Sequence, residues 1–228
     1  MTLKSFFTLL TATAGLMVFG IVSSAGAQSS TPEAGPNDAA IEPTIPERAG
    51  VWGDIVYGRE GAPVELIEYG SLTCPHCASF SRDVLPRLMV DFVNDGKVRF
   101  VFRNFVLNRL DLAASAASRC ITDEAAVKRT LSALFLEQAS WTQSENPIAS
   151  ISEIVGREGL SQQLMTECVT DQQVQRHIVE MMQTGAKQYK VNSVPTLVLN
   201  GVPMSFPGYA ALKLRIEAQL GSDYLNKN

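Results

Sequence analysis

The sequence predicts an α/β fold in which a central mixed sheet is flanked by helices and carries an inserted, all-helical lobe. Short segments with strand character lie near both ends of residues 51–228. The first two are separated by one helical segment, and a long helical stretch, about 108–189, separates them from the last two. Strand–helix–strand order predicts a parallel pair. A stretch as long as 108–189 exceeds any ordinary loop, so we expect it to fold as an insertion.

The first half of this domain is predicted to run strand, helix, strand. Residues 64–69 (VELIEY) alternate as a half-buried strand does, and residues 98–102 (VRFVF) form the second strand. Between them, apolar residues recur at helical spacing from Cys74 to about Val93, with Pro86 as an expected kink. We therefore expect a parallel pair joined by a right-handed crossover.

The second half is predicted to return antiparallel. Asn200-Gly201 separates a strand at 196–199 from a last strand near 202–206, and this dipeptide favours a tight hairpin. A closing helix follows over 209–220. The insertion is expected to pack as its own lobe, with helices near 110–120, 123–138, 148–157, 161–169 and 171–189.

Composition excludes several classes of protein. The chain has 228 residues, of which 46% are hydrophobic and 18% charged, so it can build a core and is neither wholly disordered nor a coiled coil. Its formal net charge of −4 argues against a nucleic-acid binder, which would carry a basic excess. With two histidines and four cysteines, an extensive histidine-based metal centre is not expected.

The N-terminus predicts export. Lys4 precedes an apolar run, and Ala25 and Ala27 match the small-residue cleavage pattern, so residues 1–27 are interpreted as a signal peptide. An uncleaved membrane anchor is the alternative. Residues 28–50 are rich in proline and poor in large apolar residues, which predicts a flexible linker before the domain at 51–228. In an oxidising compartment, an even number of cysteines usually means disulfides.

The chemistry is concentrated in Cys74-Pro75-His76-Cys77, which follows a strand and opens a helix. Backbone N–H groups and the helix dipole at this end favour a thiolate at Cys74. Pro75 fits the first turn of a helix, and His76 can add positive charge or a hydrogen-bond donor. A cysteine pair whose reduced form is stabilised in this way is a strong oxidant.

Two other interpretations of the motif were weighed. Half of a zinc site needs further ligands, but the chain has no second CxxC, and Cys120 and Cys168 are far apart in sequence. A purely structural disulfide across four residues restricts the unfolded chain very little and would stabilise poorly. Both are less favoured than a redox-active pair.

The segment from Glu68 to Cys77 (EYGSLTCPHC), together with Ser193-Val194-Pro195-Thr196, resembles the DsbA-like thiol–disulfide oxidoreductases of the bacterial periplasm. The resemblance covers about residues 51–220. It implies a thioredoxin-like fold with a helical insertion, in which Cys74 is the exposed nucleophile and Cys77 its buried partner. It also implies that Pro195 is a cis-proline beside the active site, with Val194 before it, and that both contact substrate.

Further roles follow from this resemblance and from the remaining cysteines. Glu68 matches a buried acid that could relay a proton to or from Cys77, whereas the alternative is a strand glutamate facing outward. Cys120 and Cys168 are expected to pair in an oxidising compartment, with two buried free thiols as the alternative, and the family does not settle this. Beyond the Cys74–Cys77 disulfide, no cofactor and no metal are expected. Pro203, Phe206 and Pro207 are candidates for an apolar rim near the site.

The leading hypothesis is a periplasmic enzyme that donates the Cys74–Cys77 disulfide to folding secreted proteins with cysteine pairs. The resemblance implies a membrane quinone-linked oxidase as the partner that reoxidises it, and we expect a monomer with no nucleic-acid partner. A disulfide isomerase or reductase on the same fold is the nearest alternative. A periplasmic metal-binding or chaperone module that uses CxxC as ligands is a third.

Overall fold

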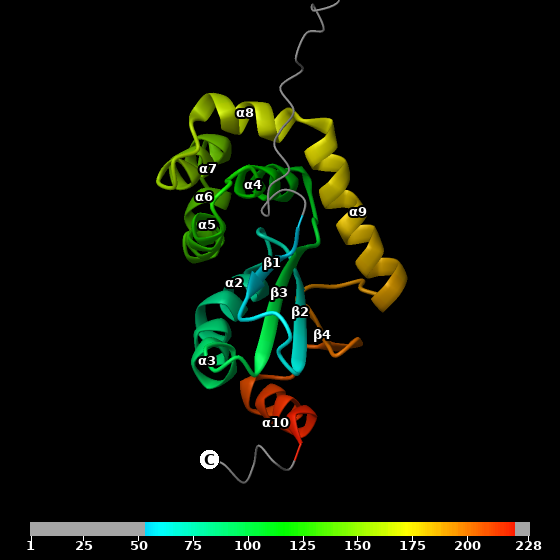
Figure 1. Cartoon of the computed structure of the whole chain (residues 1–228). Coiled ribbons are helices and arrows are strands. Elements are labelled where there is room, and N and C mark those ends of the chain that lie inside the picture. Colours follow the sequence, from blue (N-terminus) through cyan, green and yellow to red (C-terminus); the bar gives the residue numbers. More distant parts are fainter. Residues whose placement is uncertain (1–52, 222–228) are drawn as a thin grey trace, which may run out of the picture. The chain divides into compact units, whose positions relative to one another are not determined.

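The computed structural model describes residues 53–221 (Figure 1). The predicted signal peptide at 1–27 and the predicted linker at 28–50 lie outside the described residues, as do both ends of the predicted domain. Within residues 53–221, no helix combines the length and the apolar character that crossing a membrane requires.

A five-stranded mixed sheet forms the centre of the domain, with the strand order β1-β3-β2-β4-β5. β2 and β3 pair in parallel, whereas β1–β3, β2–β4 and β4–β5 pair antiparallel. The predicted fold class, parallel first pair and returning hairpin are therefore confirmed. β1 was not predicted, because three residues are too few to show alternation. The bounds are β1 (Ile55–Tyr57), β2 (Val64–Gly70), β3 (Val98–Asn104), β4 (Thr196–Leu199) and β5 (Val202–Ser205).

The helix between β2 and β3 bends around Pro86 without breaking. Proline lacks an N–H and crowds the preceding turn, so the α-helical hydrogen-bond pattern cannot continue through it. The helix instead widens into two π-helical segments, and Val84 shows the distortion with a φ of −110°. Its parts are α2 (Pro75–Ser79), η1 (Phe80–Val84), α3 (Leu85–Leu88) and η2 (Met89–Val93).

Six helices occupy the stretch between β3 and β4, and most begin at a side-chain cap. Asn108, Asp123, Asn146, Ser161 and Asp171 each accept a hydrogen bond from the first turn that follows. The segment predicted as one helix at 123–138 ends earlier and is followed by a separate short helix. The bounds are α4 (Arg109–Arg119), α5 (Glu124–Leu136), α6 (Gln138–Thr142), α7 (Pro147–Gly156), α8 (Gln162–Thr170) and α9 (Gln172–Tyr189), and α10 (Tyr209–Leu220) closes the fold.

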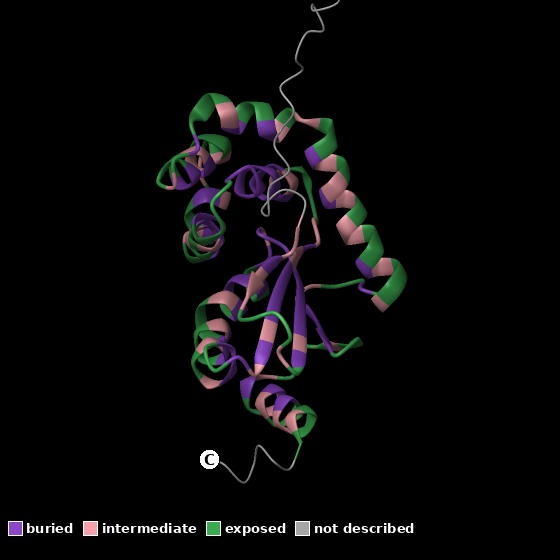
Figure 2. Cartoon of the chain, viewed as in Figure 1, coloured by how far each residue is buried: buried purple, intermediate pink, exposed green. Residues whose placement is uncertain are grey.

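The helical insertion shares its core with the sheet, contrary to the expectation of a lobe that packs by itself. One apolar cluster runs from Leu66 of β2 and Phe100 of β3 through Leu134 and Trp141 to Met165 of α8. Figure 2 shows that most of β2, β3 and α4 is buried. The alanines of α4 explain this continuity, since small side chains let neighbouring elements approach closely.

A disulfide links two helices of the insertion. It joins Cys120, the C-cap of α4, to Cys168 of α8, with 6.2 Å between the Cα atoms. Both cysteines are buried. This is the pair that the sequence analysis expects, and it encloses a chain segment that contains α5, α6 and α7.

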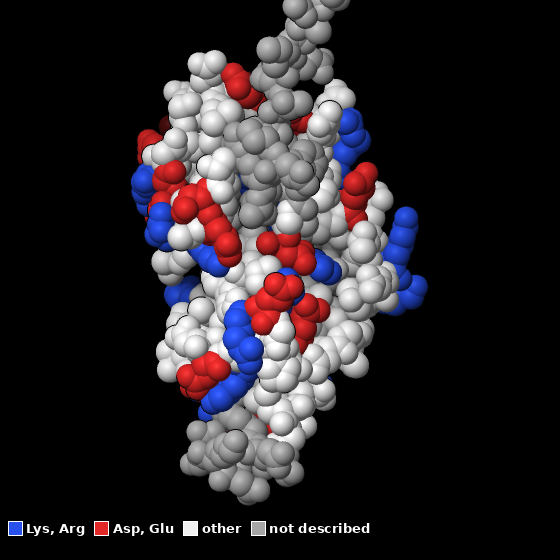
Figure 3. Space-filling model, in the orientation of Figure 1, with Lys and Arg blue, Asp and Glu red and all other residues white. Residues whose placement is uncertain are grey.

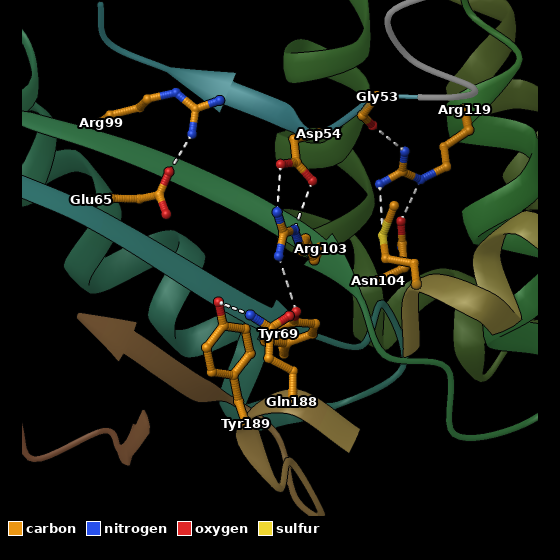
Figure 4. A network of polar contacts seen from close by, with 11 residues as sticks. Gly53, Asp54, Glu65, Tyr69, Arg99, Arg103, Asn104, Arg119, Gln188 and Tyr189 are labelled. Atoms are coloured by element: carbon orange, nitrogen blue, oxygen red, sulfur yellow. Dashed lines mark hydrogen bonds and ion pairs between the residues drawn. The ribbon is translucent and has the colours of Figure 1, made fainter. Parts of the chain in front are cut away.

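A polar network surrounds the C-terminal end of β3 (Figure 4). Arg103 of β3 donates two hydrogen bonds to Asp54, both 2.7 Å long, and a third to the Tyr69 hydroxyl. The guanidinium of Arg119, on α4, is buried and donates to Asn104 and to the Gly53 carbonyl. The network therefore ties the segment before β1 to β3 and α4.

Gly185 lets α9 approach the sheet. A Cβ at this position would overlap the ring of Tyr69, with the ring Cζ only 2.8 Å away. Tyr69 is 0% exposed, and its hydroxyl is fixed by Arg103, so the ring cannot move aside. The backbone of Gly185 has ordinary helical geometry, so its φ angle does not require glycine. Close packing against Tyr69 does.

We predict that Gly185→Ala lowers the free energy of unfolding by about 1–3 kcal/mol, the usual cost of overpacking. Gly156, the last residue of α7, provides the matched control, because nothing lies within 4 Å of a Cβ built there. Gly156→Ala should be neutral or stabilise by up to about 1 kcal/mol. Urea denaturation of both variants checks this, and equal stabilities would contradict it.

Candidate active site

The parallel strands β2 and β3 place the site where both strands end. β2 leads through Ser71, Leu72 and Thr73 to Cys74, which caps α2 with an extended backbone. Pro75 occupies the first turn of the helix, where a missing N–H costs little. The Cys74 side chain therefore lies at a helix N-terminus, as the sequence predicts.

Cys77 is buried, as the resemblance implies, whereas Cys74 is more enclosed than expected. Cys74 and Cys77 are free thiols, and Cys77 is 0% exposed. Cys74 is only 7% exposed, so the expectation that its side chain is exposed is wrong for this conformation. The reason is the segment before β4: the Val194 carbonyl lies 3.7 Å from the Cys74 sulfur and accepts its thiol hydrogen bond.

The two thiols have opposite electrostatic surroundings. The pKa of Cys74 is lowered to about 6, mainly because the Cys77 thiol donates a hydrogen bond to it, helped by the N–H groups of Cys77 and His76 and by the His76 charge. The pKa of Cys77 is raised, since its proton is held in the bond to Cys74 and burial disfavours its charge. Cys74 is therefore the thiolate of the pair at neutral pH.

Glu68 lies beneath the pair, inside the core. Alternation along β2 puts it on the same face as Leu66, the face covered by α2, and it is 2% exposed. The outward-facing alternative is thus wrong. Burial, followed by the charge of Cys74, raises the pKa of Glu68 well above its ordinary value. Its negative charge in turn contributes to raising the pKa of Cys77.

A groove of about 430 Å³ opens beside Cys74. The peptide bond between Val194 and Pro195 is cis, as expected, and both residues line the groove. Phe206 also lines it and packs edge-on against Phe80, with 5.3 Å between the ring centroids. Of the three residues predicted for an apolar rim, Phe206 is in place. Pro203 and Pro207 are exposed and do not line the groove.

The sequence analysis missed the residues that hold the loop before Cys74. Asp111 of α4 accepts a 2.9 Å hydrogen bond from the Leu72 N–H and another from the Leu107 N–H. Gln138 of α6 donates to the carbonyls of Leu72 and Cys74, at 2.8 and 3.0 Å. Both side chains are buried. Asp111 could be recognised only as a helix-start residue, and no local signal marks Gln138.

No cluster of three or more His, Cys, Asp or Glu side chains able to hold a metal ion occurs within residues 53–221. The pair Cys74 and Cys77 thus stands without a third ligand in this part of the chain. The arrangement suits thiol chemistry: a stabilised thiolate, a buried protonated partner and an adjoining groove.

Comparisons with known proteins agree with this geometry. The family model described as thioredoxin matches residues 51–218. A Rickettsia conorii protein, provisionally named a protein-disulfide oxidoreductase, is 26% identical over 149 residues, which are 65% of this chain and 54% of that protein. The chain thus spans about half the length of this relative.

Two further matches cover more of their proteins. The probable disulfide bond formation protein D of Bacillus anthracis is 26% identical over 171 residues, covering 72% of this chain and 76% of that protein. The crystal structure of α-DsbA1 from Wolbachia pipientis superposes with a TM-score of 0.69 at 23% identity, covering 77% of this chain and 94% of that one. This structural likeness shows the shared fold.

We predict that the thiolate absorbance of Cys74 titrates with a midpoint near pH 6. Cys77→Ala removes the main hydrogen-bond donor, so the midpoint should move towards the ordinary cysteine value of about 8.5. Cys77→Ser keeps an O–H donor and is the matched control, with a midpoint between the two. A midpoint unchanged in Cys77→Ala would contradict the assigned cause.

We also predict that Gln138→Ala lowers the free energy of unfolding by about 1–3 kcal/mol, because it leaves the buried Leu72 carbonyl without this donor, whereas the Cys74 carbonyl still accepts the Ala78 N–H. Gln143 is an exposed glutamine just beyond α6, so Gln143→Ala should change stability by less than about 0.5 kcal/mol. Denaturant unfolding of the reduced proteins measures both. Equal effects of the two substitutions would show that Gln138 does not brace the loop.

Proposed function

We propose that this chain, which belongs to the DsbA-like thiol–disulfide oxidoreductases of the thioredoxin family, donates a Cys74–Cys77 disulfide to proteins that contain pairs of cysteines. The observation that carries the proposal is the unequal pair of thiols at the start of α2. The pKa of Cys74 is lowered to about 6 and that of Cys77 is raised. In such a pair, Cys74 leaves a mixed disulfide readily as a thiolate, and Cys77 is the thiol that resolves it.

The donation takes place in two exchanges. A substrate thiolate attacks the Cys74 sulfur of the disulfide, which breaks the Cys74–Cys77 bond and forms a mixed disulfide. Cys77 leaves as a thiolate and takes up one proton, for which the carboxyl group of Glu68 is the nearest proposed donor. A second substrate thiolate then attacks the substrate sulfur of the mixed disulfide and releases the Cys74 thiolate. The substrate loses two electrons, and the enzyme pair gains them.

Thiolate stabilisation favours the oxidising direction. A cysteine whose folded pKa is depressed stabilises the reduced form in full above its unfolded pKa of about 8.5, and this stabilisation is lost as the pH falls from there through about 6. Each unit of depression corresponds to about 1.4 kcal/mol, or about 30 mV in a two-electron couple. A reduced form stabilised in this way gives up its disulfide readily.

Substrate binding is proposed for the groove beside Cys74. An extended peptide can pair with an exposed backbone segment as an added strand, and the segment Val194–Pro195 lies beside the Cys74 sulfur. Apolar contacts from Phe80 and Phe206 would hold neighbouring side chains without demanding a particular sequence. This combination suits partly unfolded proteins of varied sequence.

The cellular setting of the proposal follows from the N-terminal sequence. Residues 1–27 would direct export to the periplasm, where folding secreted proteins are the substrates and a membrane quinone-linked oxidase restores the disulfide. A monomer without a cofactor other than its disulfide would suffice. On the face shown in Figure 3, acidic and basic side chains are interspersed, so this face offers no basic surface for nucleic acid.

The test is the equilibrium of the Cys74–Cys77 pair in glutathione redox buffers, followed by alkylation and mass spectrometry of the peptide that contains both. We expect a reduction potential well above the −200 mV region of glutaredoxins. A value near −270 mV, as in thioredoxin, would indicate a reductase or isomerase instead. Cys77→Ser should trap mixed disulfides on Cys74, whereas Cys74→Ser should form none.

A further inference from the structure

The groove beside Cys74 carries a carboxylate at the end that lies away from the cysteine. Its helical wall comes from residues of α2 and η1 at helical spacing, namely His76, Ser79, Phe80 and Asp83. The groove therefore follows this helix away from Cys74, with His76 near the cysteine and Asp83 about two turns further on. Among the described residues that line the groove, Asp83 has the only carboxylate.

The rest of the groove offers no charge to a substrate beyond His76. Phe80 and Phe206 pack edge-on in its middle, and Val84 is buried beside them. A charged side chain has no partner on an apolar wall of this kind. The wall opposite the helix is also formed by uncharged residues, namely Ser193, Val194, Pro195, Ser205 and Phe206.

Arg82 shows where a substrate cation can bind. Its Nε and Nη2 atoms donate to the two carboxylate oxygens of Asp83, at 2.9 and 2.8 Å, and Nη2 also donates to Ser79 at 3.4 Å. Asp83 and Ser79 both line the groove. More than half of each side chain of the Arg82–Asp83 pair is exposed, and an ion pair of this kind contributes little to stability. A lysine or arginine of a substrate can therefore take the place of Arg82 at this carboxylate.

We propose that Asp83 is a specificity-determining residue, which selects substrate segments with lysine or arginine about four positions from the reacting cysteine. The proposal rests on the proposed function and adds a preference at one substrate position. A helix rises about 1.5 Å per residue, so Asp83 lies about 13 Å from Cys74 along the helix axis. An extended peptide advances about 3.3 Å per residue and covers this length in about four residues.

The test is a competition between two peptides for Cys74 in the full chain with Cys77→Ser. Each peptide has one cysteine, activated as a disulfide with nitrothiobenzoate, and the two differ only in carrying lysine or glutamate at the fourth position on both sides of it. The Cys74 thiolate attacks the peptide sulfur, a new disulfide forms, and the aromatic thiolate leaves. No further oxidant or reductant is needed, and intact-mass spectrometry counts the two adducts.

We expect the lysine adduct to exceed the glutamate adduct by about threefold or more at low salt, as an exposed ion pair allows. Asp83→Asn should reduce this ratio to nearly one, because the carboxylate is lost. Arg82→Gln should increase it, because the competing cation is removed. High salt should weaken the preference in the parent Cys77→Ser chain, since exposed charges are screened.

A second ion pair supplies matched controls for net charge. Lys97 and Asp95 are joined at 2.8 Å, and the Asp95 side chain is 57% exposed, compared with 56% for Asp83. This pair lies just before β3, at the end of the parallel strands opposite to Cys74. Asp95→Asn and Lys97→Gln change the net charge as Asp83→Asn and Arg82→Gln do. Both should leave the adduct ratio of the parent chain unchanged.

The outcomes separate this proposal from the proposed function. Equal adduct ratios in the Asp83→Asn and Asp95→Asn variants would show that net charge alone attracts the lysine peptide, and would overturn the role of Asp83. Equal amounts of the two adducts in the parent chain would overturn it as well, while leaving thiol exchange at Cys74 intact. If neither peptide forms an adduct on Cys74, the proposed function fails and this proposal fails with it.

Discussion

The buried carboxylate of Asp111 is the constraint on which the active site depends. Parallel pairing brings the ends of β2 and β3 together, and the loops that follow them are linked at the surface by a hydrogen bond from Asn108 to Thr73. Asp111 accepts one N–H from each loop, at Leu72 and at Leu107, and so joins them through a single side chain. Burial raises the pKa of Asp111, and these N–H donors act against that shift. The position of Cys74 at the start of α2 follows from this link.

The helical insertion therefore does more than cover the sheet. Its helix α4 supplies Asp111, α6 supplies Gln138, and α5 closes the cavity beside Glu68. A lobe with an independent core could move relative to the cysteines, whereas the apolar cluster shared with β2 and β3 keeps these contacts in register. The insertion is thus part of the active site, because its polar side chains reach the loop only if its apolar side chains pack against the strands.

Local chemistry explains how much of this could be predicted from the sequence. The Cys74–Cys77 motif, the helix starts and the Asn200-Gly201 turn depend on neighbouring residues, and their consequences can be derived from a few positions. The contacts of Gln138 cross more than sixty residues of chain, and no periodicity encodes them. The enclosure of Cys74 was missed for the same reason, since the carbonyl that covers it belongs to Val194, far along the chain. The family resemblance identified Glu68 as a candidate buried acid, but only the structure shows the cavity beside it.

The unequal thiols also imply a coupling between electron and proton transfer. Lowering the pKa of Cys74 favours its release from a mixed disulfide, whereas the raised pKa of Cys77 means that every cycle adds and removes one proton at a sulfur that water does not reach. The pKa of Glu68 is also raised by burial. Proton transfer from Cys77 to Glu68 therefore costs less free energy than transfer to a carboxylate with an ordinary pKa. A site that stabilises one thiolate by burying its partner must therefore also provide a group that exchanges the partner's proton, and the buried carboxyl of Glu68 is the candidate for this exchange.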